Sequence, residues 1–356
     1  MSTDHGLRLC EHQVGGHMTK ESKPDTLVDD AGRFYKPYQG DARSAREVAF
    51  YQLVWNPPAQ LPSTSPLQRS YSRPRTTRDP LPPNAPAATP EPLQPVVGEG
   101  GSEGIACRAS PAQGSASGVR AGEGVDAGVW GVGALYGPAA GTPPLEQDLM
   151  GLRAFVPRMF GTAEVVGRQY CVMEDVCHAY LQPCVLDVKM GYVTQYAWAT
   201  DAYREKCRAK DQATTQSSMG FRISGLQVYR QQEGEMKKMG RSWGKTLTQD
   251  TLHQAFTLFA DNGALTPGQV WAPSSPAIVR LQQLLAWLEQ QTSFCFFQAS
   301  LLFTYEGTAT SLDTANLQVH FIDFAHTFPT PRTPDLNVLT ALQSLLALLA
   351  KLSDQR

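Results

Sequence analysis

A break in composition after Trp55 constrains this 356-residue chain more than any other feature. Prolines are dense over residues 56–95, and over residues 98–141 the bias shifts to Gly, Ala and Ser. Such a stretch buries too little apolar surface to offset the chain entropy that ordering would cost. We therefore predict a disordered insertion over residues 56–144. A folded domain tolerates such an insertion because loop-closure entropy grows only slowly with loop length.

The insertion also contains four closely spaced arginines, Arg69, Arg73, Arg75 and Arg78. Their simplest interpretation is that they keep the segment soluble. A nuclear signal, or a binding site for partner proteins within this Pro-rich segment, is the alternative interpretation.

The flanking pieces, 1–55 and 145–356, carry the patterns of folded structure. Apolar alternation predicts strands, and apolar residues at helical spacing predict helices. The result is an α+β chain with sheet early and mixed elements later. The expected strands are 33–36, 170–173, 184–188, 221–223, 226–229, 301–305 and 319–324, and the expected helices are 45–53, 200–211, 276–291 and 336–352.

No apolar segment of the sequence is typical of membrane targeting or anchoring. The first residues, MSTDHGLRLCEHQ, lack the apolar core of a signal peptide, and the most apolar run, 345–350, is too short to cross a bilayer. The seven cysteines are scattered and form no CxxC pair, which argues against a disulfide framework and a zinc site. We expect an intracellular protein of the nucleus and cytoplasm with no membrane span.

Positive charge gathers in one part of a chain whose net charge is only −2. Residues 189–245 contain eleven Lys and Arg against five Asp and Glu, a charge of +6 that leaves −8 for the rest. Such a cluster raises the local concentration of a polyanion, although solvated helix faces account for some of these residues. The chain has no aromatic pattern typical of RNA recognition, and we expect no direct nucleic-acid binding.

The densest chemical signal is the strand-like run PCVLDVKMG over residues 183–191. Alternate residues of a strand share a face, so Asp187 and Lys189 point the same way, beside a glycine that lets the chain approach a ligand. This arrangement suits the binding of phosphate groups. A surface salt bridge between the two residues is an equally good interpretation of the spacing alone.

Two weaker signals are compatible with a nucleotide site. Asp323 stands between Ile322 and Phe324 at a strand end, where a carboxylate can hold Mg²⁺ together with substrate phosphates, although such an Asp is more often a cap or turn former. Lys36 lies in a predicted strand and Glu47 in the next helix. ATP-dependent kinases use that kind of ion pair to direct a lysine at nucleotide phosphates.

Six short blocks, in order along the chain, resemble the inositol polyphosphate kinase family. They are HQVGGH (12–17), REVAFY (46–51), MEDV (173–176), PxxxDxKxG (183–191), LLFTYEG (301–307) and IDFAHT (322–327). In addition, the pair Lys210-Asp211 followed by GFRISG (220–225) is most similar to the plant-type multikinase branch. The resemblance covers essentially everything outside 56–144.

The resemblance implies a two-lobed, ATP-grasping α+β fold that is distantly similar to protein kinases. Residues 1–55 would form the first part of the N-terminal lobe, and residues 145–176 its end and the hinge. Residues 177–356 would form the C-terminal lobe, with a helical inositol-phosphate-binding insert at about 200–211.

The same resemblance implies roles for individual residues. Lys189 would be catalytic, bridging the reacting hydroxyl and the γ-phosphate of ATP, and would contact substrate as well. Asp323, also catalytic, would hold Mg²⁺ with Ser300 nearby. ATP would be bound by Gln13, Val14, Gly15, Gly16, Lys36, Glu47, Glu174, Val176 and Asp187. The inositol phosphate would contact Arg43, Arg204, Lys206, Lys210 and His326.

We therefore expect an inositol polyphosphate multikinase, a phosphotransferase with an alcohol group as acceptor, that uses ATP and Mg²⁺. It would convert inositol trisphosphate to tetrakis- and pentakisphosphate. The alternatives are an inositol hexakisphosphate kinase that makes pyrophosphates, and an inactive scaffold, against which the intact Lys36, Lys189 and Asp323 speak. The sequence departs from the family pattern at Ala299, and at Tyr203 and Cys207 of the substrate helix, which bears on the choice of substrate.

Overall fold

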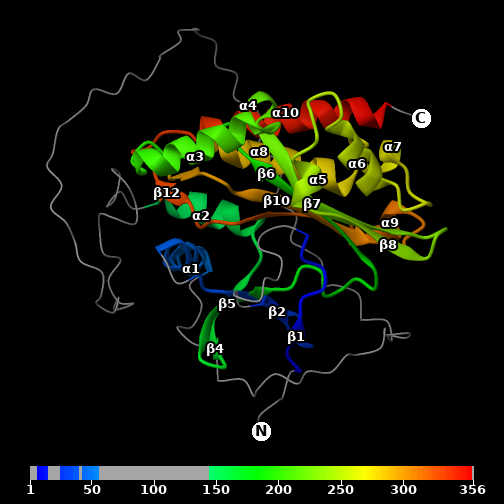
Figure 1. Ribbon diagram of the computed structural model, residues 1–356, viewed down its shortest axis with the longest axis horizontal. Coiled ribbons are helices and arrows are strands. Elements are labelled where there is room, and N and C mark those ends of the chain that lie inside the picture. Colours follow the sequence, from blue (N-terminus) through cyan, green and yellow to red (C-terminus); the bar gives the residue numbers. More distant parts are fainter. Residues whose placement is uncertain (1–5, 15–24, 40–41, 56–143, 355–356) are drawn as a thin grey trace, which may run out of the picture. The chain divides into compact units, whose positions relative to one another are not determined.

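The computed structural model describes residues 6–14, 25–39, 42–55 and 144–354, which Figure 1 traces along the chain. These residues all belong to one structural unit, which comprises residues 1–71 and 131–356. The predicted insertion over 56–144 lies, apart from residue 144, outside the described residues. The boundaries that we expect at residues 55, 144 and 176 remain a prediction.

The first sheet joins strands from both sides of the insertion. Its order is β1-β2-β3-β5-β4, and every neighbouring pair is antiparallel. In the central pair Lys36 lies opposite Cys171, so a strand from before the insertion is held by one from after it. The strands are β1 (Arg8–Leu9), β2 (Leu27–Val28), β3 (Arg33–Pro37), β4 (Met159–Val165) and β5 (Arg168–Glu174).

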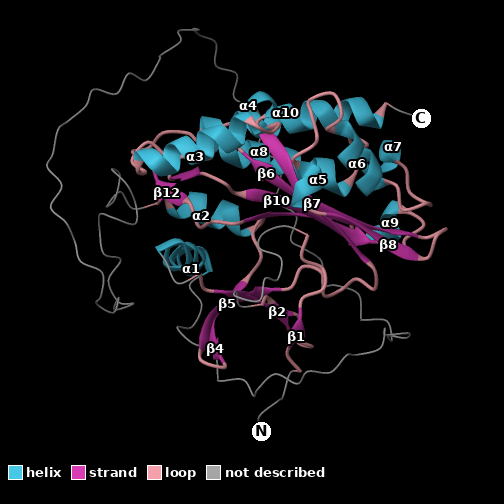
Figure 2. Ribbon diagram, in the orientation of Figure 1, coloured by secondary structure: helices cyan, strands magenta, loops and turns pink. Residues whose placement is uncertain are grey.

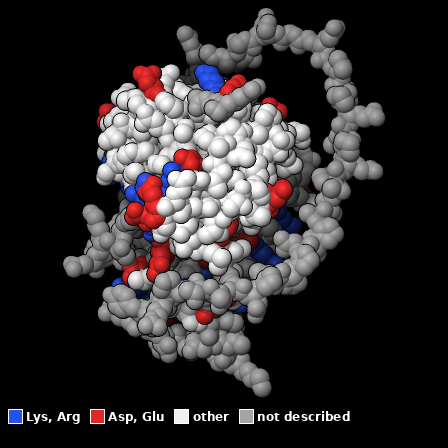
Figure 3. Space-filling model, turned by 90° about the vertical axis from the view of Figure 1, so that its right-hand side faces the viewer, with Lys and Arg blue, Asp and Glu red and all other residues white. Residues whose placement is uncertain are grey.

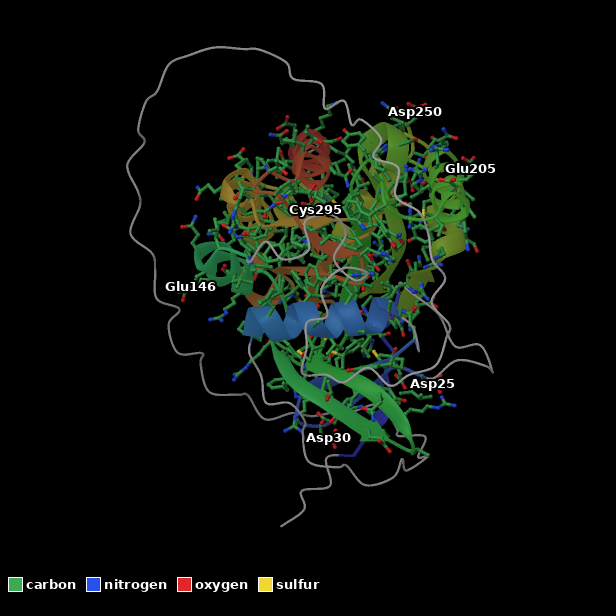
Figure 4. All side chains as sticks on the ribbon, turned by 90° about the vertical axis from the view of Figure 1, so that its left-hand side faces the viewer. Asp25, Asp30, Glu146, Glu205, Asp250 and Cys295 are labelled. Carbon is green, nitrogen blue, oxygen red and sulfur yellow. The ribbon has the colours of Figure 1, made fainter. Side chains whose placement is uncertain are left out.

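Two helices border the insertion, α1 (Ala42–Trp55) before it and α2 (Glu146–Arg153) after it. Arg153 Nε donates a 2.6 Å hydrogen bond to the Val54 carbonyl, which ties the end of α2 to the end of α1. Figure 4 shows α1 between the strands β4 and β5 of the first sheet and the remaining elements. The helix packs against β4 of this sheet and against α2.

The second sheet forms the centre of the larger part of the fold. Its order is β11-β10-β6-β7-β8, again antiparallel throughout. Leu186, Val188 and Met190 of β6 are fully buried in the hydrophobic core, so the alternate residues of this strand face the opposite side. The strands are β6 (Pro183–Met190), β7 (Phe221–Arg230), β8 (Glu235–Met239), β10 (Ser300–Glu306) and β11 (Gln318–Ile322).

The prediction of two separate strands at 221–223 and 226–229 is wrong in detail. The structure has a single strand, β7, in which Asp187 pairs with Gly225 and Val188 with Ile223. Ser224 is therefore an extra residue, a β-bulge that bends the strand without ending it. The bulge explains the break in the apolar pattern.

Helices cover one side of the second sheet, as Figure 2 shows for α6, α8 and α10. The core between them includes the fully buried Leu281 of α8 and Phe256 of α6. A short pair of strands, β9 (Phe294–Phe296) and β12 (Thr327–Pro329), lies apart from both sheets. The helices are α3 (Asp201–Gln212), α4 (Gln216–Met219), α5 (Arg241–Gly244), α6 (His253–Ala260), α7 (Pro267–Val270), α8 (Pro276–Gln290), α9 (Leu312–Ala315) and α10 (Leu336–Ser353).

Helix α10 is the one described helix that is long and apolar enough to cross a membrane, judged by length and composition alone. A core helix passes the same test. Leu342, Leu345 and Leu349 of α10 are fully buried in the hydrophobic core. Asp335 caps its first turn, accepting hydrogen bonds from the N–H groups of Asn337 and Val338. The packing of α10 is that of a core helix.

Candidate active site

Two lysines from different sheets meet at one carboxylate. Lys36 Nζ of β3 lies 2.9 Å from Asp323 Oδ1, and Lys189 Nζ of β6 lies 2.7 Å from Asp323 Oδ2. Asp323 directly follows β11, in a left-handed backbone conformation with φ of 68° that Asp tolerates better than most residues. The turn directs its carboxylate at both ammonium groups, so the structure brings these three predicted residues together.

Glu47 of α1 holds the other side of Lys36. Its Oε1 accepts a 2.7 Å hydrogen bond from Lys36 Nζ and a 3.2 Å bond from the N–H of Phe324. Burial lowers the pKa of Lys36, but the charges of Asp323 and Glu47 outweigh it and hold that pKa well above its usual value. Burial likewise raises the pKa of Asp323, but Lys189 and then Lys36 outweigh it and keep the group ionised.

Lys189 has a second fixed partner. Its Nζ donates a 2.7 Å hydrogen bond to the backbone carbonyl of Gln298. A lysine ammonium has three N–H groups, and two of them are directed at Asp323 and Gln298. The third N–H therefore has a defined direction in which to meet a ligand.

Two buried oxygen atoms beside Lys189 are without a partner among the residues described. Asp187 is 5% exposed and Ser300 is fully buried, and neither Asp187 Oδ1 nor Ser300 Oγ has a hydrogen bond of normal geometry to a described residue. The Ser300 hydroxyl still lies close enough to Asp187 to lower the pKa of that carboxylate. Ser300 lies opposite Lys189 in the β10–β6 pair. Burial raises the pKa of Asp187, against the opposing effect of Lys189. Buried polar atoms are normally satisfied, so this pair indicates a place for a ligand.

The segment that contains Gln13 and Val14 lies against the second sheet. A side chain at Gly225 would overlap the carbonyl oxygen of Val14, so this close approach requires glycine. Gly225 is also the strand partner of Asp187, which places Val14 near that carboxylate. Gln13 and Val14 are among the predicted ATP-binding residues, whereas Gly15 and Gly16 lie outside the described residues.

The predicted hinge residues follow the end of β5 at Glu174. Asp175 donates its N–H to the carbonyl of Gly32 at 2.9 Å, and Cys177 donates its N–H to the carboxylate of Asp175 at 3.0 Å. Between them, the N–H of Val176 has no partner within the described ranges. A free N–H flanked by two fixed ones is a suitable donor for the edge of a base.

The predicted cations of α3 separate into two kinds. Arg204 donates to Asp201 of its own helix and to the Ala197 carbonyl, at 3.1 Å for the latter. Lys206 is exposed. Lys210 is half-buried, and burial together with the charges of Arg222 and Lys189 lowers its pKa. The structure therefore brings Lys210 to the Lys189 region, whereas Arg204 is bonded to Asp201 of its own helix and to the segment before it.

Away from Lys189, the described charged side chains of the outer surface are few or paired with one another. Glu205 is labelled on the outer side of α3 in Figure 4, where it pairs with Arg208. On the face shown in Figure 3, Lys and Arg are few and most of the surface is uncharged.

Arg222 is a residue that the sequence interpretation missed. It is 7% exposed, its Nε has no partner in the part of the chain that is described, and it lies opposite Lys189 in the β6–β7 pair. Burial lowers its pKa, and the charge of Asp187 opposes that effect. The sequence did place Arg222 in a predicted strand. It did not show that this strand pairs with the strand that contains Asp187.

His326 and Arg43 lie on the same side of the site. His326 is 8% exposed, and its Nε2 lies 3.5 Å from the Tyr203 hydroxyl of α3. Burial, and then the charges of Arg46 and Arg43, lower the pKa of His326 to about 3. The imidazole is therefore neutral at physiological pH, and it donates or accepts hydrogen bonds without carrying a charge.

The described residues suit a divalent metal that is held by one carboxylate together with nucleotide phosphates. No group of three or more His, Cys, Asp and Glu gathers among the described residues, so the protein does not build a full metal cage there. One carboxylate together with nucleotide phosphates is the usual Mg²⁺ environment in kinases. Asp323, with the unpartnered oxygens of Ser300 and Asp187 close by, suits that arrangement.

Comparison with known proteins gives consistent results. A family model described as inositol polyphosphate kinase matches residues 170–350. The chain is similar to the inositol polyphosphate multikinase alpha of Arabidopsis thaliana, with 29% identity over 353 residues, 96% of this chain and 94% of that protein. A multikinase of Oryza sativa subsp. indica is 26% identical over 359 residues, 96% and 92% of the two chains. A solved structure of an inositol phosphate multikinase matches with a TM-score of 0.50 and 31% identity, covering 56% of this chain and 90% of that one.

Proposed function

This chain belongs to the inositol polyphosphate kinase family, and from that premise we propose that it is a multikinase acting on inositol tris- and tetrakisphosphate. The expected fold is confirmed, and the chain is an ATP-dependent kinase of inositol phosphates. The observation that carries the proposal is the meeting of Lys36 and Lys189 at Asp323. Two cations fixed on one carboxylate are a means of holding a triphosphate and the phosphoryl group that leaves it.

The nucleotide would be held from three directions. Lys36, kept charged and fixed by Glu47, contacts the phosphates. The free N–H of Val176 and the carbonyl of Glu174 bind the adenine edge, and the buried Asp187 contacts the ribose. These roles are compatible with the positions of the residues, and they remain part of the proposal.

The transfer itself needs in-line placement and cancellation of charge more than covalent chemistry. The oxygen of the acceptor hydroxyl forms a bond to the γ-phosphorus while the bond from that phosphorus to the β,γ-bridging oxygen breaks. ADP leaves with that oxygen, and the hydroxyl proton is released to solvent. Lys189, 13% exposed and fixed by two hydrogen bonds, directs its remaining N–H at the phosphoryl oxygens and the acceptor. A donor preorganised in this way costs little reorganisation during the reaction, which is the main source of its catalytic effect.

We propose Mg²⁺ as the metal, held by Asp323 with Ser300 nearby. When bound, the ion neutralises charge on the β- and γ-phosphates. Asp323 contributes the carboxylate, and the two lysines hold the pKa of that carboxyl group well below its usual value.

On the acceptor side, we propose that Lys210, His326 and Arg43 contact the phosphates of the inositol ring. Lys210 is the best placed of the α3 cations, because its charge reaches Lys189 and Arg222. Arg204 and Lys206 would contribute from the surface of the same helix. A highly phosphorylated substrate accounts for the accumulation of like charges here, since they repel one another until an anion occupies the site.

Location in the nucleus and cytoplasm, and partner proteins that bind the 56–144 segment, remain predictions. So does the expected absence of nucleic-acid binding.

A panel of acceptors tests the proposed function. The full-length protein is incubated with ATP, Mg²⁺ and, separately, inositol tris-, tetrakis-, pentakis- and hexakisphosphate, and the products are resolved by anion-exchange chromatography. We expect tris- and tetrakisphosphate to be converted to pentakisphosphate. Conversion of hexakisphosphate alone would instead establish a pyrophosphate-forming kinase, and turnover of none would establish an inactive scaffold. Asp323→Asn is the control for contaminating kinases.

A further inference from the structure

We propose that Tyr203 and Gln298 are positioning residues that direct Lys189 and so connect helix α3 to the reacting centre. The inference rests on the proposed function, because it assumes that Lys189 acts in phosphoryl transfer. It is carried by two hydrogen bonds that meet at Gln298. The side-chain amide of Gln298 donates to the Tyr203 hydroxyl of α3, and its backbone carbonyl accepts from the Lys189 ammonium.

The last bond of this chain fixes the direction of Lys189. The Gln298 carbonyl accepts from Lys189 Nζ at 2.7 Å, equal to the distance from Lys189 to Asp323. Without the Gln298 carbonyl, the ammonium is free to rotate about its bond to Asp323. With it, two of three donors are fixed and the third is directed.

Gln298 is held in an unusual backbone conformation to present this carbonyl. Its φ is 62°, in the left-handed region that residues with a Cβ rarely adopt. Its side-chain amide donates to the Thr194 carbonyl at 3.0 Å and to the Tyr203 hydroxyl at 2.6 Å. Both amide hydrogens are therefore used, and the side chain holds the backbone in place.

Tyr203 brings helix α3 into the chain of bonds. Its hydroxyl accepts from Gln298, and it lies in the first turn of the helix that also carries Lys210. If α3 shifts when a phosphorylated ring binds, the Tyr203 hydroxyl moves with it. The Gln298 side-chain amide follows, and with it the Gln298 backbone carbonyl that accepts from Lys189. Acceptor binding and the direction of Lys189 are thus linked through two side chains.

The kinetic test compares two tyrosines of one aromatic cluster. Tyr203→Phe removes the hydroxyl and keeps the ring, and Tyr196→Phe makes the same change at a ring 5.8 Å away whose hydroxyl has no partner within the described residues. We expect Tyr203→Phe to lower kcat about tenfold without changing the KM for ATP, because a small misplacement of a reacting group has effects of this order. Tyr196→Phe should stay within about twofold of the wild type.

Gln298→Gly is the second variant in the kinetic test. Glycine suits the positive φ of this position, so the backbone is not strained, but the amide that holds it is lost. We expect a similar loss of kcat, and we expect the Tyr203→Phe and Gln298→Gly double variant to be no worse than the poorer single variant. Additive losses, or an unchanged kcat in Tyr203→Phe, would overturn the proposal.

A chemical readout separates this proposal from the proposed function. Lys189 is labelled with an acylating reagent in the free protein, and its rate of modification is compared by peptide mass spectrometry with that of the exposed Lys351. Both variants should label Lys189 several-fold faster than the wild type and Tyr196→Phe, because a loosened amine is more accessible. Equal rates in all four proteins would contradict the positioning role. The labelling rates can be measured even in a protein that phosphorylates no inositol phosphate. Absence of turnover would refute the proposed function, whereas equal labelling rates would refute the positioning role.

Discussion

Lys36 Nζ lies 2.9 Å from Asp323 Oδ1, although the two residues are 287 positions apart in the chain. Lys36 belongs to the first sheet and Asp323 follows the last strand of the second, so this contact joins the two sheets at the site. Lys189 completes the arrangement from the other side of the carboxylate. This cluster of two lysines and a carboxylate therefore forms only when residues from both ends of the chain are folded together.

The first prediction concerns the partner of Lys36. Glu47→Gln keeps an oxygen to accept the Phe324 N–H but removes the charge that helps to raise the pKa of Lys36. We expect the KM for ATP to rise about tenfold, because the Gln oxygen can still accept from Lys36 but the charge that strengthens this bond is lost. Steady-state kinetics with varied ATP measure this. Lys36→Met should have a larger effect, and a Glu47→Gln enzyme with the wild-type KM would show that the ion pair does not direct Lys36.

The second prediction concerns the close approach at Gly225. Gly225→Ala would place a methyl group on the Val14 carbonyl oxygen, so the segment that contains Val14, which we propose contacts the nucleotide, must move. We expect weaker ATP binding by calorimetry and a loss of about 1–3 kcal/mol in the free energy of unfolding. Gly240→Ala is the matched control, because a side chain at Gly240 meets open space. Equal ATP affinity in the two variants would rule out the contact as a determinant of the site.

The third prediction follows from a buried histidine away from the site. Burial, and then Arg280, lower the pKa of His320 to about 4. Between that value and the unfolded pKa of about 6.5, the unfolded state binds more protons, so stability falls as the pH falls through this range. At pH 5 the residue should cost about 2 kcal/mol, which His320→Gln removes.

Urea denaturation at pH 7 and pH 5 measures this effect as a difference between the two proteins. The wild type should lose more stability than His320→Gln on going to pH 5. Parallel losses in both proteins would show that His320 is protonated in the folded state.

The fourth prediction concerns the long insertion. Trp55 Nε1 bonds to the Pro157 carbonyl at 3.0 Å, Arg153 bonds to the Val54 carbonyl, and the Leu145 N–H bonds to a Ser293 side chain. Both flanks are thus held by the folded part of the chain. We expect a variant with residues 58–142 replaced by a short Gly-Ser linker to keep kcat within about twofold. Loss of turnover in a variant with the wild-type circular dichroism spectrum would give the insertion a catalytic role.

Local patterns made much of the fold predictable. The strand containing Asp187 and Lys189, the helix containing Glu47 and the apolar helix near the C-terminus follow from periodicity, because each is set by residues a few positions apart. The Lys36–Glu47 pair was predictable for the same reason, since only a short connection separates the strand from the helix.

The missed features depend on long-range packing. The position of Arg222 opposite Lys189 is set by strand register across a β-bulge, which the sequence pattern showed only as a gap. The left-handed backbone of Gln298, and its bond to Tyr203, arise from the way α3 lies on the sheet.

The most direct test of the central claim is the rate of phosphoryl transfer from ATP to inositol trisphosphate by Lys189→Ala, at saturating concentrations of both. Lys237→Ala, at a partly exposed lysine paired with Glu233, is the control. We predict that Lys189→Ala loses at least about 100-fold in rate, equivalent to about 3 kcal/mol of transition-state stabilisation. A Lys189→Ala enzyme as fast as Lys237→Ala would contradict the account.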